Sequence, residues 1–242
     1  MRAISTMAHL INESTLRSLE RLADDIAWAQ ANGRGDMARY FQTLLRSKAS
    51  NDLLEQIAVE SIGGVCSGKK LGADGFLPNG QGVEAKPHKG ASTQAKGGCI
   101  NDDSPMKLKR DYHEISTIVF LNADESGDRV NWQVVVPFRY WTGARFAKIC
   151  KRLKLDWVWP SDETEQVAML DALVAEHKKE TYVRSNALSL GVLAKIPVSE
   201  ISLWVHPDLP VKRLPAVLRT LRTRMSAPPK PSLPPAAPAP SE

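Results

Sequence analysis

The sequence predicts an α/β fold with a mixed central sheet of about four to five strands, flanked by helices and preceded by a helical N-terminal region. Two patterns indicate this class. Apolar residues recur at spacings of three and four from Leu16 to about Ile62, as in helices that bury one face. Beyond Gly63, runs of β-branched residues and tight turns alternate with helical stretches, which is typical of a sheet covered by helices.

Three helices are expected before the first strand. The first carries regularly spaced apolar residues from Leu16 to Ala27, and Gly33 provides a stop signal because glycine tolerates the backbone of a helix end. The third begins with an Asp-x-x-Glu sequence at Asp52, whose two side chains can cap the exposed N–H groups reciprocally. The expected helices span about residues 16–32, 37–46 and 52–62.

Residues 72–86 predict a β-hairpin. Gly72 to Leu77 forms the first expected strand, and Val83 to Lys86 forms the second. Between them lies Asn79-Gly80, the dipeptide most typical of a tight hairpin turn. A loop rich in Gly, Ser and Lys is expected from Pro87 to Asp103.

The second half of the chain continues the alternation. Its clearest buried strand is Ile115 to Leu121, a run dominated by β-branched residues. The other expected elements are strands at 131–138 and 201–205 and helices at about 138–153, 162–179 and 214–225.

These elements divide the chain into four regions. Residues 1–50 form an N-terminal helical region, and residues 51–160 form the core. Residues 161–225 form a helical and basic region packed on that core. The segment 226–242 holds seven prolines and is expected to be disordered, because proline-rich chains form neither helices nor ladders.

The composition excludes several classes. Of 242 residues, 43% are apolar and 24% charged, as in ordinary globular proteins. No apolar run approaches the roughly 18 to 20 residues that cross a bilayer, and no long apolar segment follows the first methionine. We therefore expect a cytoplasmic protein without membrane contact. The three cysteines lie far apart, which argues against a zinc cluster or a disulfide framework. No organic cofactor is expected.

The charge distribution points to a polyanionic partner. The net charge is +5, from 32 basic and 27 acidic residues. Residues 63–110 contain eight basic and four acidic residues, and residues 178–230 contain ten basic and three acidic residues. Two basic segments on an otherwise acidic body are typical of a phosphate-binding face.

The residues best suited to chemistry lie in the expected hairpin. Antiparallel pairing across Asn79-Gly80 would place Asp74 beside Glu84. Glu84 and Lys86 are two apart, so in a strand both project from one face. Two carboxylates and one ammonium in a single pocket are suited to binding Mg²⁺ and to orienting a water molecule near a phosphodiester.

This arrangement resembles the PD-(D/E)xK nuclease superfamily, whose motif is an acid followed across a hairpin by (D/E)-x-K. Asp74 matches the first acid, and Glu84-Ala85-Lys86 matches the second part; Ala73 stands where the family usually has proline. The family often adds a glutamate from the preceding helix. Glu55 and Glu60 are the candidates, and Glu55 is preferred because it lies in the first helical turn.

The resemblance implies a restriction-endonuclease-like core and a Mg²⁺-dependent deoxyribonuclease, with a type II restriction endonuclease as the preferred role. Asp74, Glu84 and the carbonyl of Ala85 would hold the metal, Lys86 would position the water, and Glu55 would support the metal or its waters. Double-stranded DNA would be the substrate and a homodimer the expected assembly, because a twofold axis matches a palindromic site. Restriction also implies a cognate DNA methyltransferase.

Further basic and polar residues are expected to contact DNA. They flank the hairpin or lie in the C-terminal basic segment. The set is Lys69, Lys70, Lys89, Lys96, Tyr182, Arg184 and Asn186.

Three alternatives remain open. The hairpin residues can be solvent-facing, with Glu84 and Lys86 forming a weak surface ion pair worth under about 1 kcal/mol. The chain can be a nucleic-acid-binding protein without catalysis. A repair or recombination nuclease, either a junction resolvase or an exonuclease, can also use the same fold.

Overall fold

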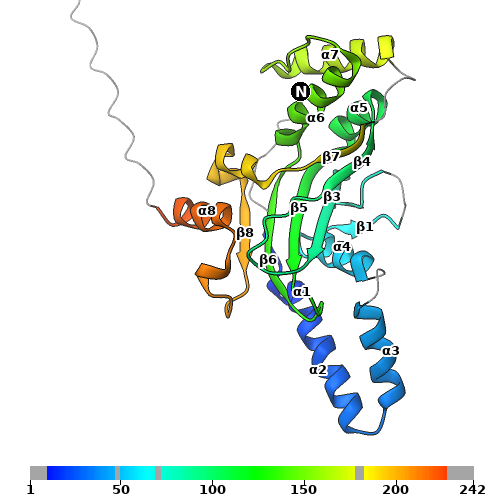
Figure 1. Ribbon diagram of the computed structural model, residues 1–242, viewed down its shortest axis with the longest axis vertical. Coiled ribbons are helices and arrows are strands. Elements are labelled where there is room, and N and C mark those ends of the chain that lie inside the picture. Colours follow the sequence, from blue (N-terminus) through cyan, green and yellow to red (C-terminus); the bar gives the residue numbers. More distant parts are fainter. Residues whose placement is uncertain (1–9, 47–49, 69–71, 178–182, 228–242) are drawn as a thin grey trace, which may run out of the picture.

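The computed structural model describes residues 10–46, 50–68, 72–177 and 183–227. These residues form a mixed six-stranded sheet in the order β1-β2-β3-β5-β6-β8, with helices on both faces, and a separate two-stranded ribbon of β4 and β7 (Figure 1). The strands are β1 (Val65–Cys66), β2 (Gly75–Phe76), β3 (Gly82–Lys89), β4 (Cys99–Asp103), β5 (Ile115–Ala123), β6 (Val130–Pro137), β7 (Val183–Ala187) and β8 (Ser202–Val205).

The α-helices include a counterpart of each of the six helices predicted from sequence and two that were not predicted, α1 and α5. They are α1 (Glu13–Leu16), α2 (Ser18–Ala31), α3 (Gly35–Arg46), α4 (Ser50–Glu60), α5 (Pro105–Glu114), α6 (Arg139–Leu153), α7 (Glu163–His177) and α8 (Ala216–Ser226). Three short 3₁₀ helices accompany them, η1 (Leu190–Lys195), η2 (Val198–Glu200) and η3 (Val211–Arg213).

The centre of the sheet is the parallel pair β3 and β5, which α5 connects as a crossover. All other neighbouring strands in this sheet are antiparallel. Alternation along β3 sends Val83 and Ala85 to the face covered by α4, where they join the core of the N-terminal helices. Glu84 and Lys86 therefore project toward the other face.

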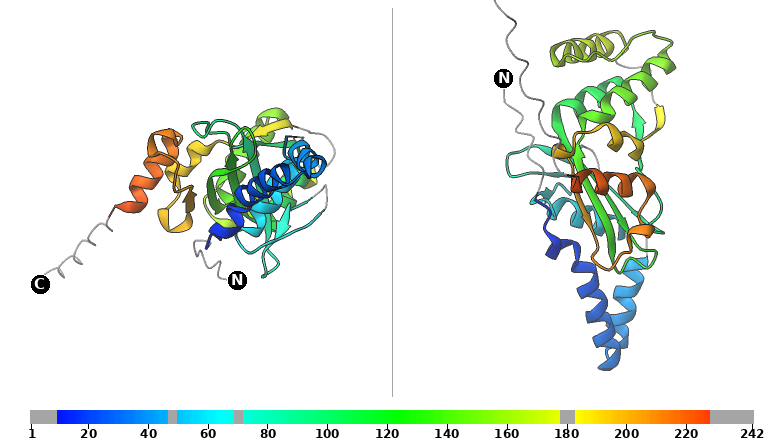
Figure 2. Two further views of the ribbon diagram at one scale, coloured as in Figure 1. Left: turned by 90° about the horizontal axis from the view of Figure 1, so that it is seen from below. Right: turned by 90° about the vertical axis from the view of Figure 1, so that its left-hand side faces the viewer.

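The N-terminal helices serve the fold in two ways. Helix α4 packs against β3 and β5 and so closes one face of the sheet. Helices α2 and α3 pair with each other and project away from the sheet as a helical hairpin (Figures 1 and 2). The glycine at the tip, Gly33, has a φ of 74°, which explains why the sequence signal for a helix end is correct here.

Two further cores cover the remaining surfaces. On the opposite face of the sheet, Phe120, Trp132 and Trp141 pack with apolar residues of η1 and α8. At one end of the molecule, α5, α6 and α7 share a core around Phe146 and Leu170. None of the helices in the described ranges is long and apolar enough to cross a membrane.

Three sequence expectations are wrong in detail. The sheet has six strands rather than four to five, because β1 is a two-residue strand too short to leave a periodic signal. The expected loop 87–103 contains the end of β3 and all of β4. Helix α5 was not predicted, although Ser104 accepts a hydrogen bond from the Lys107 N–H as its N-cap and Pro105 occupies its first turn.

Several sequence expectations fall outside the described residues. They concern the basic pair Lys69 and Lys70, the aromatic Tyr182 and the proline-rich segment 228–242.

Candidate active site

The predicted hairpin is formed by β2 and β3. Gly75 pairs with Val83 and Phe76 with Gly82, and the connecting turn includes Gly80 at a φ of 80°. A side chain is strained at such a φ, so glycine suits this position. The Asp74 N–H donates to the Val83 carbonyl at 2.9 Å, which extends the pairing by one residue and fixes Asp74 beside β3.

The carboxylate of Asp74 binds the free edge of β3. Because β2 begins only at Gly75, none of the residues that the structure describes forms a strand opposite β3 beyond Val83 on this side. The Ala85 N–H instead donates to Oδ2 of Asp74 at 2.7 Å. This bond replaces a missing ladder contact and orients the Asp74 side chain toward the Glu84-Ala85-Lys86 segment.

Three oxygen atoms surround the ammonium of Lys86. Nζ forms a short ion pair with Oε1 of Glu84 and donates to the carbonyl oxygen of Ala85 at 3.2 Å. Oδ2 of Asp74 lies 4.0 Å from the same nitrogen. The three oxygen atoms that were predicted from the sequence to be metal ligands therefore all lie around Nζ of Lys86.

This cluster is shielded from solvent. The Glu84 side chain is 8% exposed and that of Lys86 is 18% exposed. Burial raises the pKa of Glu84, and the positive charge of Lys86 opposes this rise. Burial lowers the pKa of Lys86, but the charges of Glu84 and Asp74 outweigh burial and raise it overall. The expectation of a weak, solvent-facing surface pair therefore does not describe this ion pair.

Helix α4 covers the opposite face of the sheet, and its Glu55 lies within electrostatic reach of the same cluster. Burial raises the pKa of Glu55 to about 7, and the negative charge of Asp74 adds to the rise while Lys86 counteracts it. The other candidate, Glu60, is exposed and accepts a hydrogen bond from Gln56 at 2.8 Å. Of the two glutamates, the structure places Glu55 within electrostatic reach of the hairpin acids.

The raised pKa of Glu55 predicts a pH-dependent stability. Between its ordinary value of 4.5 and about 7, the folded protein binds this proton more tightly than the unfolded chain, so stability falls as pH rises through that window. We expect Glu55→Gln to remove about 1 kcal/mol of the difference in the free energy of unfolding between pH 5 and pH 8, because solvent partly screens this partly exposed carboxyl. Urea unfolding in EDTA at both pH values measures this.

Glu60→Gln is the matched control, since it makes the same change on the exposed side of α4. It should leave the pH dependence as in the wild type. An unchanged pH dependence in Glu55→Gln would show that Glu55 does not titrate in this window.

The donor set fits a hard cation. Among the described residues, no group of three or more His, Cys, Asp and Glu side chains is placed to hold a metal ion. The cluster offers two carboxylates and one backbone carbonyl, and Mg²⁺ typically takes one or two carboxylates and completes its shell with water and phosphate oxygens. The position of the Lys86 ammonium among these oxygens shows that they can surround a positive charge.

The ribbon of β4 and β7 begins beside this cluster. The backbone of Gly98 packs on the aliphatic part of Lys86, where an added Cβ would lie 3.0 Å from Cδ. Gly98 also accepts a hydrogen bond from the Leu188 N–H at 3.1 Å. This contact was missed from the sequence, although a Gly-Gly pair in a basic loop is a signal of close backbone approach.

Four predicted DNA-contacting residues lie within the described part of the chain. Arg184 and Asn186 lie on β7, which pairs antiparallel with β4, so β7 ends at Ala187 opposite Cys99, next to the Gly98 that packs on Lys86. Lys96 is exposed in the loop between β3 and β4. Lys89 instead donates to the Leu45 carbonyl near the end of α3, and burial lowers its pKa, so its ammonium stabilises a helix end.

His88 continues the face of β3 that carries Glu84 and Lys86. It packs edge-on against Trp132 with ring centroids 5.4 Å apart. Burial and the charge of Lys96 lower the pKa of His88 to about 4, so it is neutral near pH 7. Its position is consistent with a packing role.

Comparison with known proteins identifies no relative of this chain, so its function is inferred from the geometry of the site. No protein-family model matches this chain, and no curated protein is significantly similar to it. The fold is α/β with a mixed six-stranded sheet, and the candidate site combines a hairpin, a helix glutamate and a buried lysine.

Proposed function

We propose that this chain is a Mg²⁺-dependent endodeoxyribonuclease, acting as a type II restriction endonuclease on a specific double-stranded site. The observation that carries this proposal is the convergence of Asp74, Glu84 and the Ala85 carbonyl on the Lys86 ammonium. These oxygens can bind a divalent cation, and the Lys86 ammonium next to them can donate a hydrogen bond. A bound cation and a nearby hydrogen-bond donor both favour hydrolysis of a phosphodiester.

The element order supports the same class. Helix α4, which carries Glu55, precedes the hairpin that carries the acids, and strand β5 and helix α6 follow later in the chain. This order of helix, hairpin, strand and helix resembles that of PD-(D/E)xK nucleases, with β4 and the unpredicted helix α5 inserted between the hairpin and β5. The basic C-terminal segment agrees with a polyanionic substrate.

In this mechanism Asp74 and Glu84 would hold the metal, and the carbonyl of Ala85 would contribute a third oxygen. Mg²⁺ bound there would polarise the phosphodiester and acidify a coordinated water. The Lys86 ammonium donates hydrogen bonds, so it can orient the attacking water and stabilise negative charge on the phosphoryl oxygens. Glu55, with a pKa of about 7, can hold or accept a proton at neutral pH.

The reaction adds water across one P–O bond. The water oxygen forms a bond to phosphorus, the bond to the 3′ oxygen breaks, and a proton passes to that leaving oxygen. In-line attack of this kind leaves 5′-phosphate and 3′-hydroxyl ends. A homodimer would place two such sites on opposite strands of a palindromic sequence.

The decisive experiment incubates the purified protein with mixed-sequence plasmid and phage DNA, in Mg²⁺ or in EDTA. We expect discrete fragments in Mg²⁺ and none in EDTA. A smear of products would support the same chemistry in a repair or recombination nuclease. DNA binding without cleavage on any substrate would contradict the nuclease proposal and favour a non-catalytic nucleic-acid-binding protein.

A further inference from the structure

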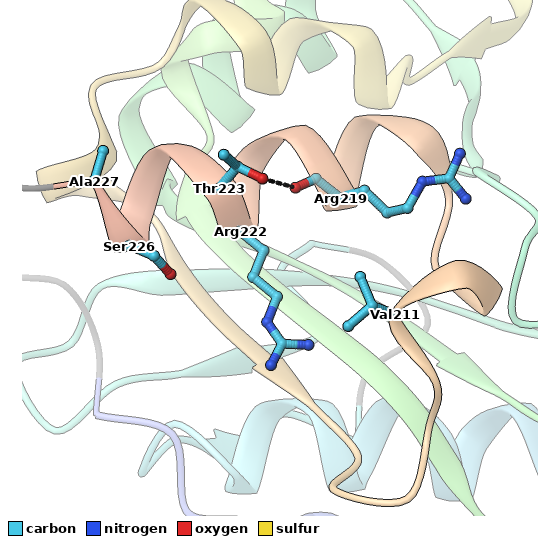
Figure 3. A pocket seen from close by; sticks show the side chains of 6 residues that line it. All are labelled: Val211, Arg219, Arg222, Thr223, Ser226 and Ala227. Carbon is cyan, nitrogen blue, oxygen red and sulfur yellow. Dashed lines mark hydrogen bonds between the residues drawn. The ribbon is translucent and has the colours of Figure 1, made fainter.

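The segment from η3 through α8 is strongly basic. Residues 211–227 contain five lysines and arginines and no acidic residue. They line a hollow of about 500 Å³ formed by Val211, Arg219, Arg222, Thr223, Ser226 and Ala227. Figure 3 shows Arg222 extending from α8 on the side where Val211 lies. The guanidinium of Arg222 beside this hollow is suited to an anionic ligand.

The cations of this segment fall into two groups. Arg219 donates to the carbonyls of Lys212 and Leu214. Arg224 donates to a carbonyl of η1 and to the carbonyl that directly follows η1, so both arginine side chains hold the fold together. The exposed side chains of Lys212, Arg213 and Arg222 make no hydrogen bond or ion pair within the described ranges. Their charges are therefore available to a partner.

A loop joins this surface to the candidate active site. Ser92 donates to the Arg213 carbonyl at 3.0 Å, and the Ser92 carbonyl accepts from Trp132 Nε1 at 3.0 Å. The same loop carries the exposed Lys96 and ends at Gly98, which packs on Lys86. Residues 92–98 thus connect the hairpin cluster with η3.

We propose that η3 and α8 form a second contact surface for double-stranded DNA, which binds the phosphate backbone away from the scissile bond. This inference rests on the proposed nuclease function. Lys212, Arg213 and Arg222 supply the phosphate contacts, and Lys96 lies on the loop between them and the cleavage site. The surface positions the duplex and reads no base sequence, because phosphate contacts carry none directly.

Fluorescence anisotropy with mixed-sequence duplexes in EDTA tests this surface without cleavage. We expect Arg213→Ala/Arg222→Ala to raise the Kd about tenfold at 0.1 M salt. The slope of log K against log salt should become less steep by about 1.8, because two phosphate contacts are lost. Circular dichroism checks that the double variant is folded.

The matched control is Lys151→Ala/Arg152→Ala, which removes the same charge from the exposed end of α6. It should change the Kd by less than about twofold. Equal losses of affinity in both double variants would show that only the net charge matters, and this would contradict the proposal. Binding by Arg213→Ala/Arg222→Ala at the wild-type Kd would also contradict it.

Cleavage assays separate the proposal for this surface from the proposed nuclease function. If the wild type cleaves DNA and Arg213→Ala/Arg222→Ala leaves the Kd unchanged, only the proposal for this surface is refuted. If the double variant weakens salt-sensitive binding but the wild type does not cleave DNA, only the nuclease function is refuted.

Discussion

Replacement of Glu84 by glutamine is expected to lower the rate of Mg²⁺-dependent DNA cleavage by about 10³-fold, equivalent to about 4 kcal/mol. The amide keeps the shape of the side chain but removes the charge that faces Lys86 and, in the proposed mechanism, the metal. DNA binding in EDTA should change little, because Glu84 is buried and carries no positive charge toward phosphate. Gel-resolved cleavage rates and anisotropy on one preparation measure both effects.

Glu114→Gln is the matched control for this change. Glu114 ends α5, is exposed and only approaches Arg110 at 3.9 Å, so cleavage should stay at the wild-type rate. Lys86→Ala should be as damaging as Glu84→Gln, since it removes the hydrogen-bond donor of the cluster. If either hairpin variant cleaved DNA at the wild-type rate, the assignment of the site would be wrong.

Much of the hairpin could be predicted from the sequence because its determinants are local. The Asn-Gly turn fixes which strands pair, and the two-residue spacing of Glu84 and Lys86 fixes their common face. The choice between Glu55 and Glu60 was harder, since both lie on one helix. It depends on how α4 packs against the sheet, and only the structure shows Glu60 in solvent.

The pairing of β4 with β7 could not be predicted. The two strands are about eighty residues apart in the chain, and neither has a strong alternating pattern. Their pairing places the segment with Arg184 and Asn186 on a ribbon that starts beside Lys86. These two residues were predicted from the sequence to contact DNA, but their position relative to the hairpin could not be predicted.

The same ribbon is anchored by a buried ion cluster. Arg145 of α6 donates two hydrogen bonds of 2.8 Å to Asp103 at the end of β4, and a third of 2.7 Å to Asp111 of α5. Arg145 is 1% exposed, and both aspartates are equally buried. Their burial shows that Asp103 stabilises the fold through Arg145.

Arg145→Met is therefore expected to destabilise the protein by about 3 kcal/mol, because it removes both guanidinium hydrogen bonds from the buried carboxylate of Asp103. Asp111 keeps its ion pairs with Lys107 and Arg110. The matched control is Arg139→Ala on the same helix, whose ion pair with Glu200 is partly exposed and should contribute no more than about 1 kcal/mol. Urea unfolding at pH 7 compares the two. Arg145→Met/Asp103→Asn should recover part of the loss, since a neutral amide tolerates burial better than a carboxylate that has lost its guanidinium. A cost for Arg145→Met no larger than that of Arg139→Ala would show that the cluster does not anchor β4. In that case the position of the ribbon beside Lys86 would depend on its apolar contacts alone.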